Sequence, residues 1–280
     1  MENSILSDFI LKSLAEDLGE GDHSSLACIQ PEAAGKAKLL LKEKGILAGI
    51  RIAEALFNII DKDLEFDVLL RDGAEVAPGD VAFQIKGRQR SILRSERLVL
   101  NIMQRMSGIA TSTHEYAEKL AGLKTRILDT RKTTPGMRFL EKEAVRIGGG
   151  VNHRMGLFDM IMLKDNHIDY SGGIKNAILN TIEYQKKNHL ELKVEIEARN
   201  LEDVKKILSV GGVDRIMLDN FSIEDTRLAV REIGGRYETE SSGGISLSTI
   251  RAYAECGVDF ISVGALTHHI KSLDMSLKAY

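Results

Sequence analysis

The stretch KVEIEARNLEDVKKILSVGGVDRIMLD, residues 193–219, decides the fold because it reads as strand, helix and strand. An apolar run at 193–196 is followed by a helix with Asn200 as its N-cap, acids in the first turn and Gly211 at its end. A second apolar run at 215–218 completes the unit. Because two strands joined through a helix usually run parallel, the stretch predicts one unit of a parallel sheet.

The same alternation recurs from about residue 125 onward. Ser222 and Ser246 are expected to cap further helices. The later strand ends lie about 22 residues apart, which is short for a unit of a regular eight-stranded barrel. We therefore expect an α/β fold with an incomplete, irregular barrel of parallel strands. The six candidate strands are 125–128, 160–163, 193–196, 215–218, 237–239 and 259–263.

The first 110 residues or so follow a different pattern. An N-terminal helix, a strand at 36–41, a helix at 50–60 and a glycine-rich alternating segment at 72–87 predict a mixed α+β domain. A long helix then begins near Ser91, with an apolar face opposed by a basic one. The apolar residues are Ile92, Val99, Ile102, Met103 and Met106, and the opposite face carries Arg90, Arg94, Arg97, Asn101 and Arg105.

Composition excludes several classes of protein. The chain has 280 residues with 43% hydrophobic and 28% charged side chains, which suits one large core with or without a smaller second domain. The lack of Trp and the few aromatic residues disfavour a nucleic-acid partner. Two distant cysteines indicate neither a disulfide framework nor a zinc site. With no signal peptide and no apolar run of about 18 residues, we expect a cytoplasmic protein without a membrane partner.

Charged and glycine residues follow each predicted strand, where side chains of a parallel barrel converge on one mouth. A single one is more often a solvated loop charge, but the set favours a binding site. Glu197 and Asp219 are hard oxygen donors that suit Mg²⁺ rather than zinc, although acids also cap helices or pair with Lys. The residues placed at the mouth are Arg131, Lys132, Lys164, Glu197, Asp219, Ser242 and Gly264.

Two glycine-containing turns predict a phosphate site at the last two strand ends. Their backbone N–H groups, with the N-terminus of a helix opened by Ser246, would face the phosphate; the alternative is an ordinary turn. His268 would add a donor or else be a surface histidine. The turn residues are Ser242, Gly243, Gly244, Val263, Gly264 and Ala265.

The segment 129–167 is locally positive in an acidic chain. Seven Arg and Lys residues oppose five acids there, whereas the whole chain has a net charge of −3. Local positive charge indicates a small anionic substrate. Two arginines in one pocket imply more than one carboxylate or phosphate group, unless these cations pair with Asp159 and Asp165. The cations concerned are Arg131, Arg154 and Lys164, with His153 beside them.

Several longer motifs extend over nearly the whole chain. The motifs DTRKT, GGGVNHR and KDNH in this order are specific together. On these and the other segments, the sequence resembles the quinolinate phosphoribosyltransferases, also called carboxylating nicotinate-nucleotide pyrophosphorylases. Ser241 stands where alanine is usual, and HSS at 23–25 replaces a Thr-containing stretch. The matching segments are EDLGEGD at 16–22, SERLVLNIMQRMSGIAT at 95–111, DTRKTTPGMR at 129–138, GGGVNHRMGLFD at 148–159, LKDNHI at 163–168, VEIEA at 194–198, IMLDNF at 216–221, SGGI at 242–245 and ISVGALTH at 261–268.

This resemblance implies a reaction and roles for residues. Quinolinate and phosphoribosyl pyrophosphate would give nicotinate mononucleotide, pyrophosphate and carbon dioxide, for NAD synthesis. The two quinolinate carboxylates would be held by Arg131, His153, Arg154 and Lys164, with Arg97 coming from the other subunit. The catalytic residues serving Mg²⁺-bound phosphoribosyl pyrophosphate would be Lys132, Glu197 and Asp219, with Thr130 also in the substrate site. Phosphate would be held by Ser242, Gly243, Gly244, Val263, Gly264, Ala265 and His268.

The resemblance also implies an assembly. An N-terminal α+β domain over 1–110 would be completed by the tail 268–280, and the barrel would occupy 111–267. The homodimer would share its active sites, and dimers would be able to assemble into a hexamer. Three other functions stay open: the related enzyme of molybdenum transport operons, a salvage enzyme acting on nicotinate, and a non-catalytic sensor of phosphorylated metabolites.

Overall fold

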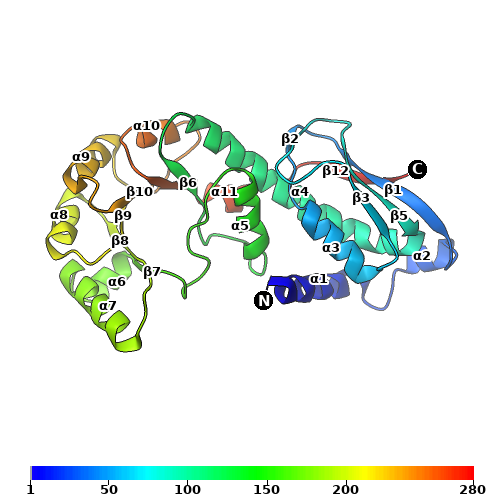
Figure 1. Cartoon of the computed structure of the whole chain (residues 1–280), viewed down its shortest axis with the longest axis horizontal. Helices are drawn as coiled ribbons and strands as arrows, with labels where there is room; N and C mark the ends of the chain where they lie inside the picture. The colour runs from blue at the N-terminus through cyan, green and yellow to red at the C-terminus, as the bar shows by residue number, and fades with distance from the viewer. Residues whose placement is uncertain (1) are drawn as a thin grey trace. The chain divides into compact units, whose positions relative to one another are not determined.

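The computed structural model describes residues 2–280, which form two compact units (Figure 1). The first comprises the described residues up to Ser112 together with Pro135–Gly148 and Ile270–Tyr280. The second comprises Thr113–Thr134 and Gly149–His269. The sequence placed all of 111–267 in the barrel, whereas the structure groups Pro135–Gly148 with the first unit.

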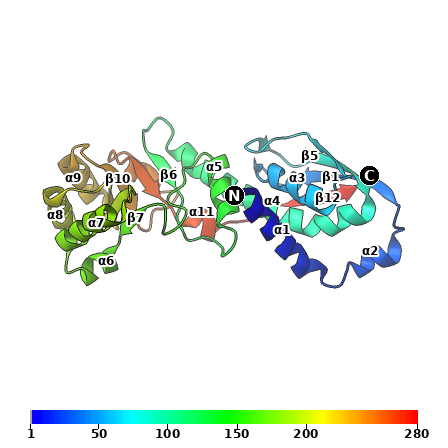
Figure 2. The same cartoon turned by 60° about the horizontal axis from the view of Figure 1, so that its bottom comes forward.

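The first unit is an α+β structure that includes most of the long helix α4 (Figure 2). Helix α4 begins at Gln89, two residues before the predicted start, and its last turns belong to the second unit. The elements are α1 Glu2–Leu18, α2 His23–Cys28, β1 Ala34–Leu41, β2 Gly45–Ile46, α3 Ile50–Ile60, β3 Glu65–Val68, β4 Glu75–Val76, β5 Val81–Arg88, α4 Gln89–Lys119, α5 Arg138–Ile147 and β12 Met275–Ala279.

The antiparallel sheet of this unit has the order β12-β1-β5-β3. Along β1, alternate residues such as Leu39 and Leu41 are buried, as expected for a strand with one face on a core. Strand β12 pairs with β1 through Leu39 and Leu277, so the C-terminal tail completes the N-terminal sheet as the resemblance implied. The aromatic ring of Phe57 on α3 contacts Phe83 on β5, which places α3 against this sheet.

The second unit contains the parallel sheet, which has the order β6-β11-β10-β9-β8-β7. Strands β6 and β7 are the edges of this six-stranded sheet, so the α/β fold with an incomplete barrel is confirmed. The elements are β6 Arg126–Leu128, β7 Ile161–Leu163, α6 Asp165–Tyr170, α7 Ile174–Asn188, β8 Val194–Ala198, α8 Leu201–Val210, β9 Arg215–Asp219, α9 Ile223–Ile233, β10 Glu238–Ser242, α10 Ile250–Ala254, β11 Phe260–Ser262 and α11 Ala265–His268.

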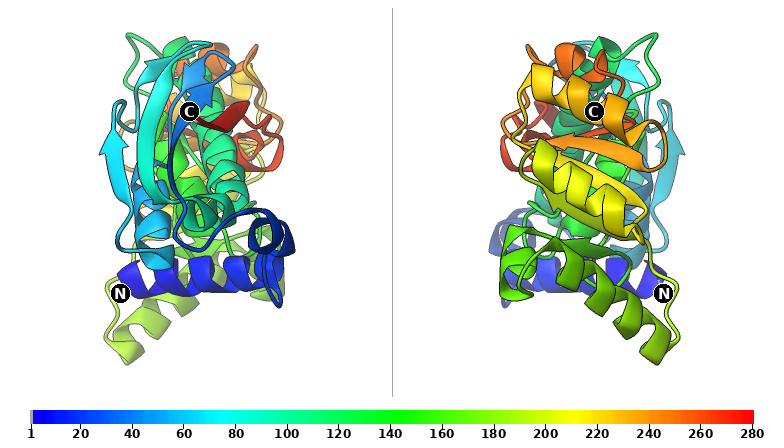
Figure 3. Two further views of the ribbon diagram at one scale, coloured as in Figure 1. Left: turned by 90° about the vertical axis from the view of Figure 1, so that its right-hand side faces the viewer. Right: turned by 90° about the vertical axis from the view of Figure 1, so that its left-hand side faces the viewer.

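Helices of this unit lie side by side along the outside of the sheet (Figure 3, right). The predicted N-caps of α8 and α9 are confirmed: Asn200 accepts a hydrogen bond from the N–H of Asp203, and Ser222 accepts one from the N–H of Asp225. The predicted cap at Ser246 is wrong, because Ser246 to Thr249 form a separate turn and α10 starts only at Ile250. None of the helices within residues 2–280 is long and apolar enough to cross a membrane.

Charged residues occur at alternate positions of the central strands. Glu195 and Glu197 share one face of β8, since successive side chains of a strand point to opposite faces. In the register of the sheet, Glu195 lies beside Arg215, and Arg215 lies beside Glu238. The opposite face carries apolar residues such as Ile196, which are fully buried. One face of the parallel sheet is therefore polar although it is buried.

Candidate active site

The cationic part of the mouth is built from the segments after β6 and before β7. Within the described residues, Nε and Nη1 of Arg131 are buried and have no hydrogen-bond partner. Arg154 lies nearby: burial lowers its pKa first, and the positive charge of Arg131 lowers it further. Its Nη1 donates to the carbonyl oxygen of Met160 at 3.2 Å. Because buried donors without partners are costly, this pair of cations is suited to an anionic ligand.

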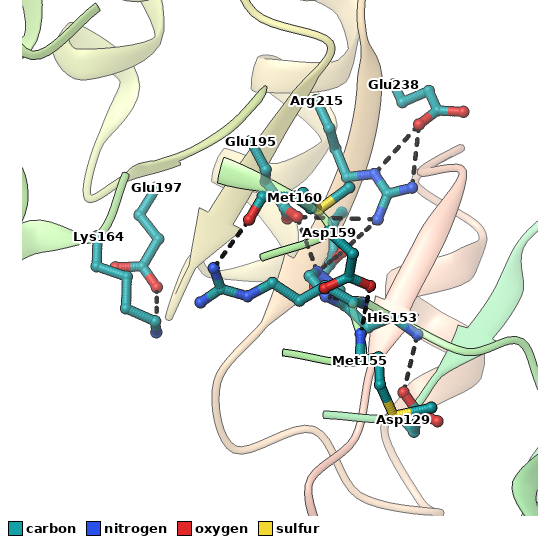
Figure 4. A network of polar contacts seen from close by, with 12 residues as sticks. Asp129, His153, Met155, Asp159, Met160, Lys164, Glu195, Glu197, Arg215 and Glu238 are labelled. Atoms are coloured by element: carbon teal, nitrogen blue, oxygen red, sulfur yellow. Dashed lines mark hydrogen bonds and ion pairs between the residues drawn. The ribbon is translucent and has the colours of Figure 1, made fainter. Parts of the chain in front are cut away.

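His153 has protein partners on both ring nitrogens. Nδ1 accepts a hydrogen bond from the N–H of Arg154 at 2.7 Å, and Nε2 lies 2.8 Å from Oε2 of Glu195 (Figure 4). Asp129, which is fully buried at the end of β6, accepts from the N–H of His153 at 2.8 Å. These contacts fix the ring within the protein, and the substrate contact that the resemblance implied for His153 stays a prediction.

The acidic part of the mouth lies at the ends of β8 and β9. Oε1 of Glu197 is 2.8 Å from Nζ of Lys164, and its Oε2 accepts from the N–H of Asp165 at 3.0 Å. Asp219 accepts from Nδ2 of Asn220 at 2.8 Å. Burial raises the pKa of Asp219, and the negative charge of Glu197 raises it further. The structure therefore brings the two predicted carboxylates together, with Lys164 paired to one of them.

This acidic pair and a second acidic cluster differ as cation sites. Ligand atoms of His153, Glu195 and Glu240 lie within 4.8 Å of one another. Nη1 of Arg215, however, is 3.0 Å from Oε2 of Glu240 and 3.9 Å from Oε2 of Glu195. A cation would meet this guanidinium, so the cluster is suited to hydrogen bonding rather than to metal. Glu197 and Asp219 keep the hard oxygen donors that Mg²⁺ prefers.

Lys132, Gly264 and His268 come together at the end of β11. A Cβ built on Gly264 would lie 2.9 Å from Nε2 of His268 and 3.1 Å from Cδ of Lys132, so glycine leaves room for both side chains. Burial lowers the pKa of His268, as do His269 and Lys132. Thr130 accepts from the N–H of Lys132 at 3.0 Å and shapes the turn after β6. Four of the predicted site residues thus lie in one small region.

The two predicted phosphate turns differ in their available N–H groups. Gly243 has a φ of 97°, and a Cβ at this position would lie only 2.1 Å from Oδ1 of Asn220. The backbone conformation and the nearby Asn220 side chain therefore both require glycine at position 243. Ser242 accepts from the N–H of Asn220 at 2.8 Å, while Gly244 is exposed with open space around its Cα. The N–H of Val263 donates to the carbonyl of Leu128 in the sheet, and the phosphate contact expected of this residue stays a prediction. Ala265 begins the short helix α11.

Arg97 belongs to the first unit, on the exposed side of α4. The apolar face predicted for this helix is buried, but the basic face is partly used within the unit. Arg90 donates to the carbonyl of Ile29, and Arg105 donates through Nε to the buried carboxylate of Glu141 at 2.8 Å. Arg94 and Arg97 stay exposed. The role implied for Arg97 in a second subunit stays a prediction.

A cavity of about 700 Å³ opens at the opposite end of the parallel strands. Its acids already have partners: Asp259 accepts from Lys124 and Thr239, and Glu238 accepts from Arg215. The N-terminal ends of barrel strands generally serve stability, whereas chemistry takes place at the C-terminal ends. We therefore locate the candidate site at the mouth rather than in this cavity.

Sequence reasoning missed Asn220 and the buried residues Glu195, Arg215 and Glu240. A signal was present, since VEIEA and ETESS carry acids at every second position of a strand. Asn220 has a φ of 57°, a conformation that Asn tolerates better than most residues. It follows Asp219 directly, and its side chain orients that carboxylate.

Known proteins resemble the chain over nearly all of its length. Residues 22–107 match the family model described as quinolinate phosphoribosyl transferase, N-terminal domain, and residues 109–278 match the C-terminal domain model. A chloroplastic carboxylating nicotinate-nucleotide pyrophosphorylase of Arabidopsis thaliana is 46% identical, with 98% of this chain and 82% of the relative covered.

Solved structures give the same result. The nicotinate-nucleotide pyrophosphorylase from Francisella tularensis has a TM-score of 0.93 at 40% identity, covering 99% of this chain and 97% of its own. NadC from Streptococcus pyogenes has a TM-score of 0.91 at 39% identity, covering 97% and 94%. With family models matching both units and relatives matching end to end, the chain belongs to the quinolinate phosphoribosyltransferase family.

Proposed function

We propose that this protein transfers the phosphoribosyl group of phosphoribosyl pyrophosphate to quinolinate, yielding nicotinate mononucleotide, pyrophosphate and carbon dioxide for de novo NAD synthesis. The observation that carries the proposal is the guanidinium of Arg131, whose Nε and Nη1 are buried and have no partner within the described residues. It lies beside a second cation, Arg154, whose pKa it lowers. A ligand with two carboxylates would neutralise both guanidinium groups.

The number of cations favours quinolinate over nicotinate. Nicotinate has one carboxylate and could neutralise only one of the two guanidinium groups. The other would stay partly desolvated without an anion, which is costly. Lys164 already has a carboxylate partner in Glu197, and His153 has one in Glu195. Arg131 and Arg154 are therefore the residues that we assign to the two substrate carboxylates, with His153 supporting them from behind.

The barrier of the reaction is mainly electrostatic. Positive charge develops at the ribose carbon as pyrophosphate leaves and the ring nitrogen of quinolinate attacks it. The exposed ammonium group of Lys132, beside Gly264 and His268, is suited to stabilise the leaving negative charge. The carboxylates of Glu197 and Asp219 favour positive charge on the sugar. Carbon dioxide is then lost from the cationic ring, which accepts the electron pair.

We also propose that Glu197 and Asp219 hold Mg²⁺ together with phosphoribosyl pyrophosphate. Burial raises the pKa of Asp219, and the negative charge of Glu197 raises it further, so a bound cation would offset the repulsion between the two carboxylates. A bound Mg²⁺ would supply charge stabilisation to the phosphate oxygens.

The proposed assembly is a homodimer with shared active sites, able to form a hexamer. The exposed Arg97 supports it, because an arginine in that position has no described acidic partner and is implied to complete a neighbouring site. We propose a cytoplasmic location, which the free thiols of Cys28 and Cys256 support. The related Arabidopsis protein is named chloroplastic.

The direct test is an assay of carbon dioxide and pyrophosphate release. Purified protein is incubated with Mg²⁺ and phosphoribosyl pyrophosphate, together with either quinolinate or nicotinate. Equal amounts of both products from quinolinate, and none from nicotinate, are expected. Turnover of nicotinate alone would support the salvage reaction, and turnover of neither would support the molybdenum-operon relative or the sensor.

A further inference from the structure

Two carboxylates, those of Glu195 and Glu240, lie buried below the mouth. Both residues are 0% exposed, and they come from β8 and β10, on either side of β9. Nη1 of Arg215 on β9 is 3.0 Å from Oε2 of Glu240. The Arg215 guanidinium also lies on the ring of Phe260, 4.1 Å from the ring centre. Burying such a group of charged side chains is costly unless they are paired and hydrogen-bonded in good geometry, so the group is expected to have a function.

The ring of His153 connects this buried group to the mouth. Its Nε2 is 2.8 Å from Oε2 of Glu195 (Figure 4). The same nitrogen is 3.6 Å from Oε2 of Glu240. Its Nδ1 accepts from the N–H of Arg154 at 2.7 Å, so in the neutral ring the proton is on Nε2 and is donated to Glu195. The side chain of His153 is only 7% exposed.

The turn that carries Arg154 is thus held from two sides. On one side, Asp129 accepts from the N–H of His153 at 2.8 Å and from Nδ2 of Asn152 at 2.6 Å. On the other side, Glu195 holds the ring of His153, and the ring holds the main chain of Arg154. A misplacement of about 1 Å in an active site can lower the rate by a large factor. The activity should therefore depend on Glu195 and His153, which hold the main chain of Arg154.

We propose that Glu195, supported by Arg215 and Glu240, is a positioning residue that sets the His153 ring and through it the Arg154 guanidinium for substrate carboxylate. This inference rests on the proposed function, because quinolinate is the ligand it serves. It assigns a role to buried charges that touch no substrate. It places the ring of His153 between the carboxylate of Glu195 and the main chain of Arg154.

Glu195→Ala and Glu195→Gln separate positioning from simple packing. Glu195→Ala removes the acceptor of Nε2 and should raise KM for quinolinate about tenfold, leaving KM for phosphoribosyl pyrophosphate within about twofold. Glu195→Gln still offers an oxygen to Nε2 and should restore KM for quinolinate. Glu238→Ala is the matched control, because Glu238 contacts Arg215 at 3.0 Å on the other side of the network and should change neither constant.

A second readout does not depend on turnover. In protein labelled with ¹⁵N-histidine, the His153 signals, assigned with His153→Asn, should show a ring protonated on Nε2. This pattern should be kept in Glu195→Gln and Glu238→Ala and altered in Glu195→Ala. If Glu195→Ala does not fold, Glu195→Asp replaces it, since the shorter side chain keeps the charge but cannot reach the ring.

The two proposals fail in different ways. If wild-type protein turns over no quinolinate, the proposed function fails, while the His153 signals still test the positioning role. If Glu195→Ala or Glu195→Asp folds with unchanged His153 signals and an unchanged KM for quinolinate, the positioning role is overturned. Equal increases in both KM values would also overturn it, because they indicate a general disturbance of the unit.

Discussion

The two sheets of this protein bury different kinds of residue. The antiparallel sheet of the first unit packs aromatic rings, with Phe66 and Phe83 only 4.6 Å apart between ring centres. The parallel sheet of the second unit buries Glu195, Arg215 and Glu240 on one face. Apolar burial stabilises without direction, whereas buried charges demand fixed geometry. The difference shows which sheet is built for stability and which for placing functional groups.

The largest expected effect concerns the apolar sheet. Phe83→Ala should lower the free energy of unfolding by about 3–5 kcal/mol, because it leaves a cavity at a fully buried position. Phe158→Ala is the matched control, since its side chain is 73% exposed and should change stability by less than about 0.5 kcal/mol. Guanidinium chloride unfolding measures both. Equal losses of stability in the two variants would mean that the buried aromatic rings of this sheet stabilise the protein no more than an exposed ring does.

The second effect concerns the mouth of the parallel sheet. Arg131→Ala should reduce kcat/KM for quinolinate at least about 100-fold, or about 2.7 kcal/mol, because a substrate carboxylate loses its partner. Lys132→Ala should lose a similar factor, mainly in kcat. Arg231→Ala on α9, an exposed arginine, is the control. Steady-state kinetics measures all three, and turnover close to that of wild type in Arg131→Ala would refute its assignment.

The buried carboxyl group of Glu240 should make the stability of the second unit depend on pH. Burial raises the pKa of Glu240 from 4.5 to about 8, and the charge of Glu195 adds to the shift. The folded state therefore keeps a proton that the unfolded state loses above about pH 4.5. The stabilisation from this bound proton is complete below about pH 4.5 and is lost as the pH rises to 8. The loss is about 1.4 kcal/mol per pH unit for one proton.

Glu240→Gln should remove that pH dependence, because the amide cannot lose a proton. Relative to wild type, the variant should become more stable as the pH rises from 5 to 8. Chemical unfolding at several pH values measures the difference. A difference that stays constant with pH would mean that Glu240 is charged throughout, held by Arg215.

The smallest effect is the recovery of activity in mixed dimers, which tests whether Arg97 of one subunit completes the active site of the other. Arg97→Ala and Lys132→Ala should each be nearly inactive alone. If active sites are shared in a dimer, mixing and refolding them together should restore about a quarter of wild-type activity, since half of the dimers are mixed and each has one intact site. Mixing Arg131→Ala with Lys132→Ala is the control and should restore nothing. No recovery in the first mixture would contradict shared sites.

Much of the fold followed from local signals in the sequence. Six strands, the caps at Asn200 and Ser222 and the polar strand ends all come from residues close together in the chain. The position of α5 did not, because its assignment to the first unit depends on contacts distant in sequence, such as that of Arg105 with Glu141. The cap at Ser246 failed because its hydroxyl contacts Ser248 and Thr249 in a turn of its own.

The site was predictable in its residue types but not in its pairings. Glu197, Asp219 and Lys132 were expected from their places after strands. The sequence could not show that the N–H of Val263 is used in the sheet, or that Gly243 makes room for Asn220. That Nε and Nη1 of Arg131 are buried without a partner among the described residues is also a property of the folded chain alone, since an arginine in sequence shows nothing about its neighbours.

Calorimetric titration of quinolinate into wild-type protein, Arg131→Ala and Glu238→Ala shows whether Arg131 binds the substrate. We expect wild type and Glu238→Ala to bind with closely similar Kd values, and Arg131→Ala to have a Kd at least about 100-fold weaker. Equal binding to all three proteins, or no binding to wild type, would rule out a dicarboxylate site built around Arg131.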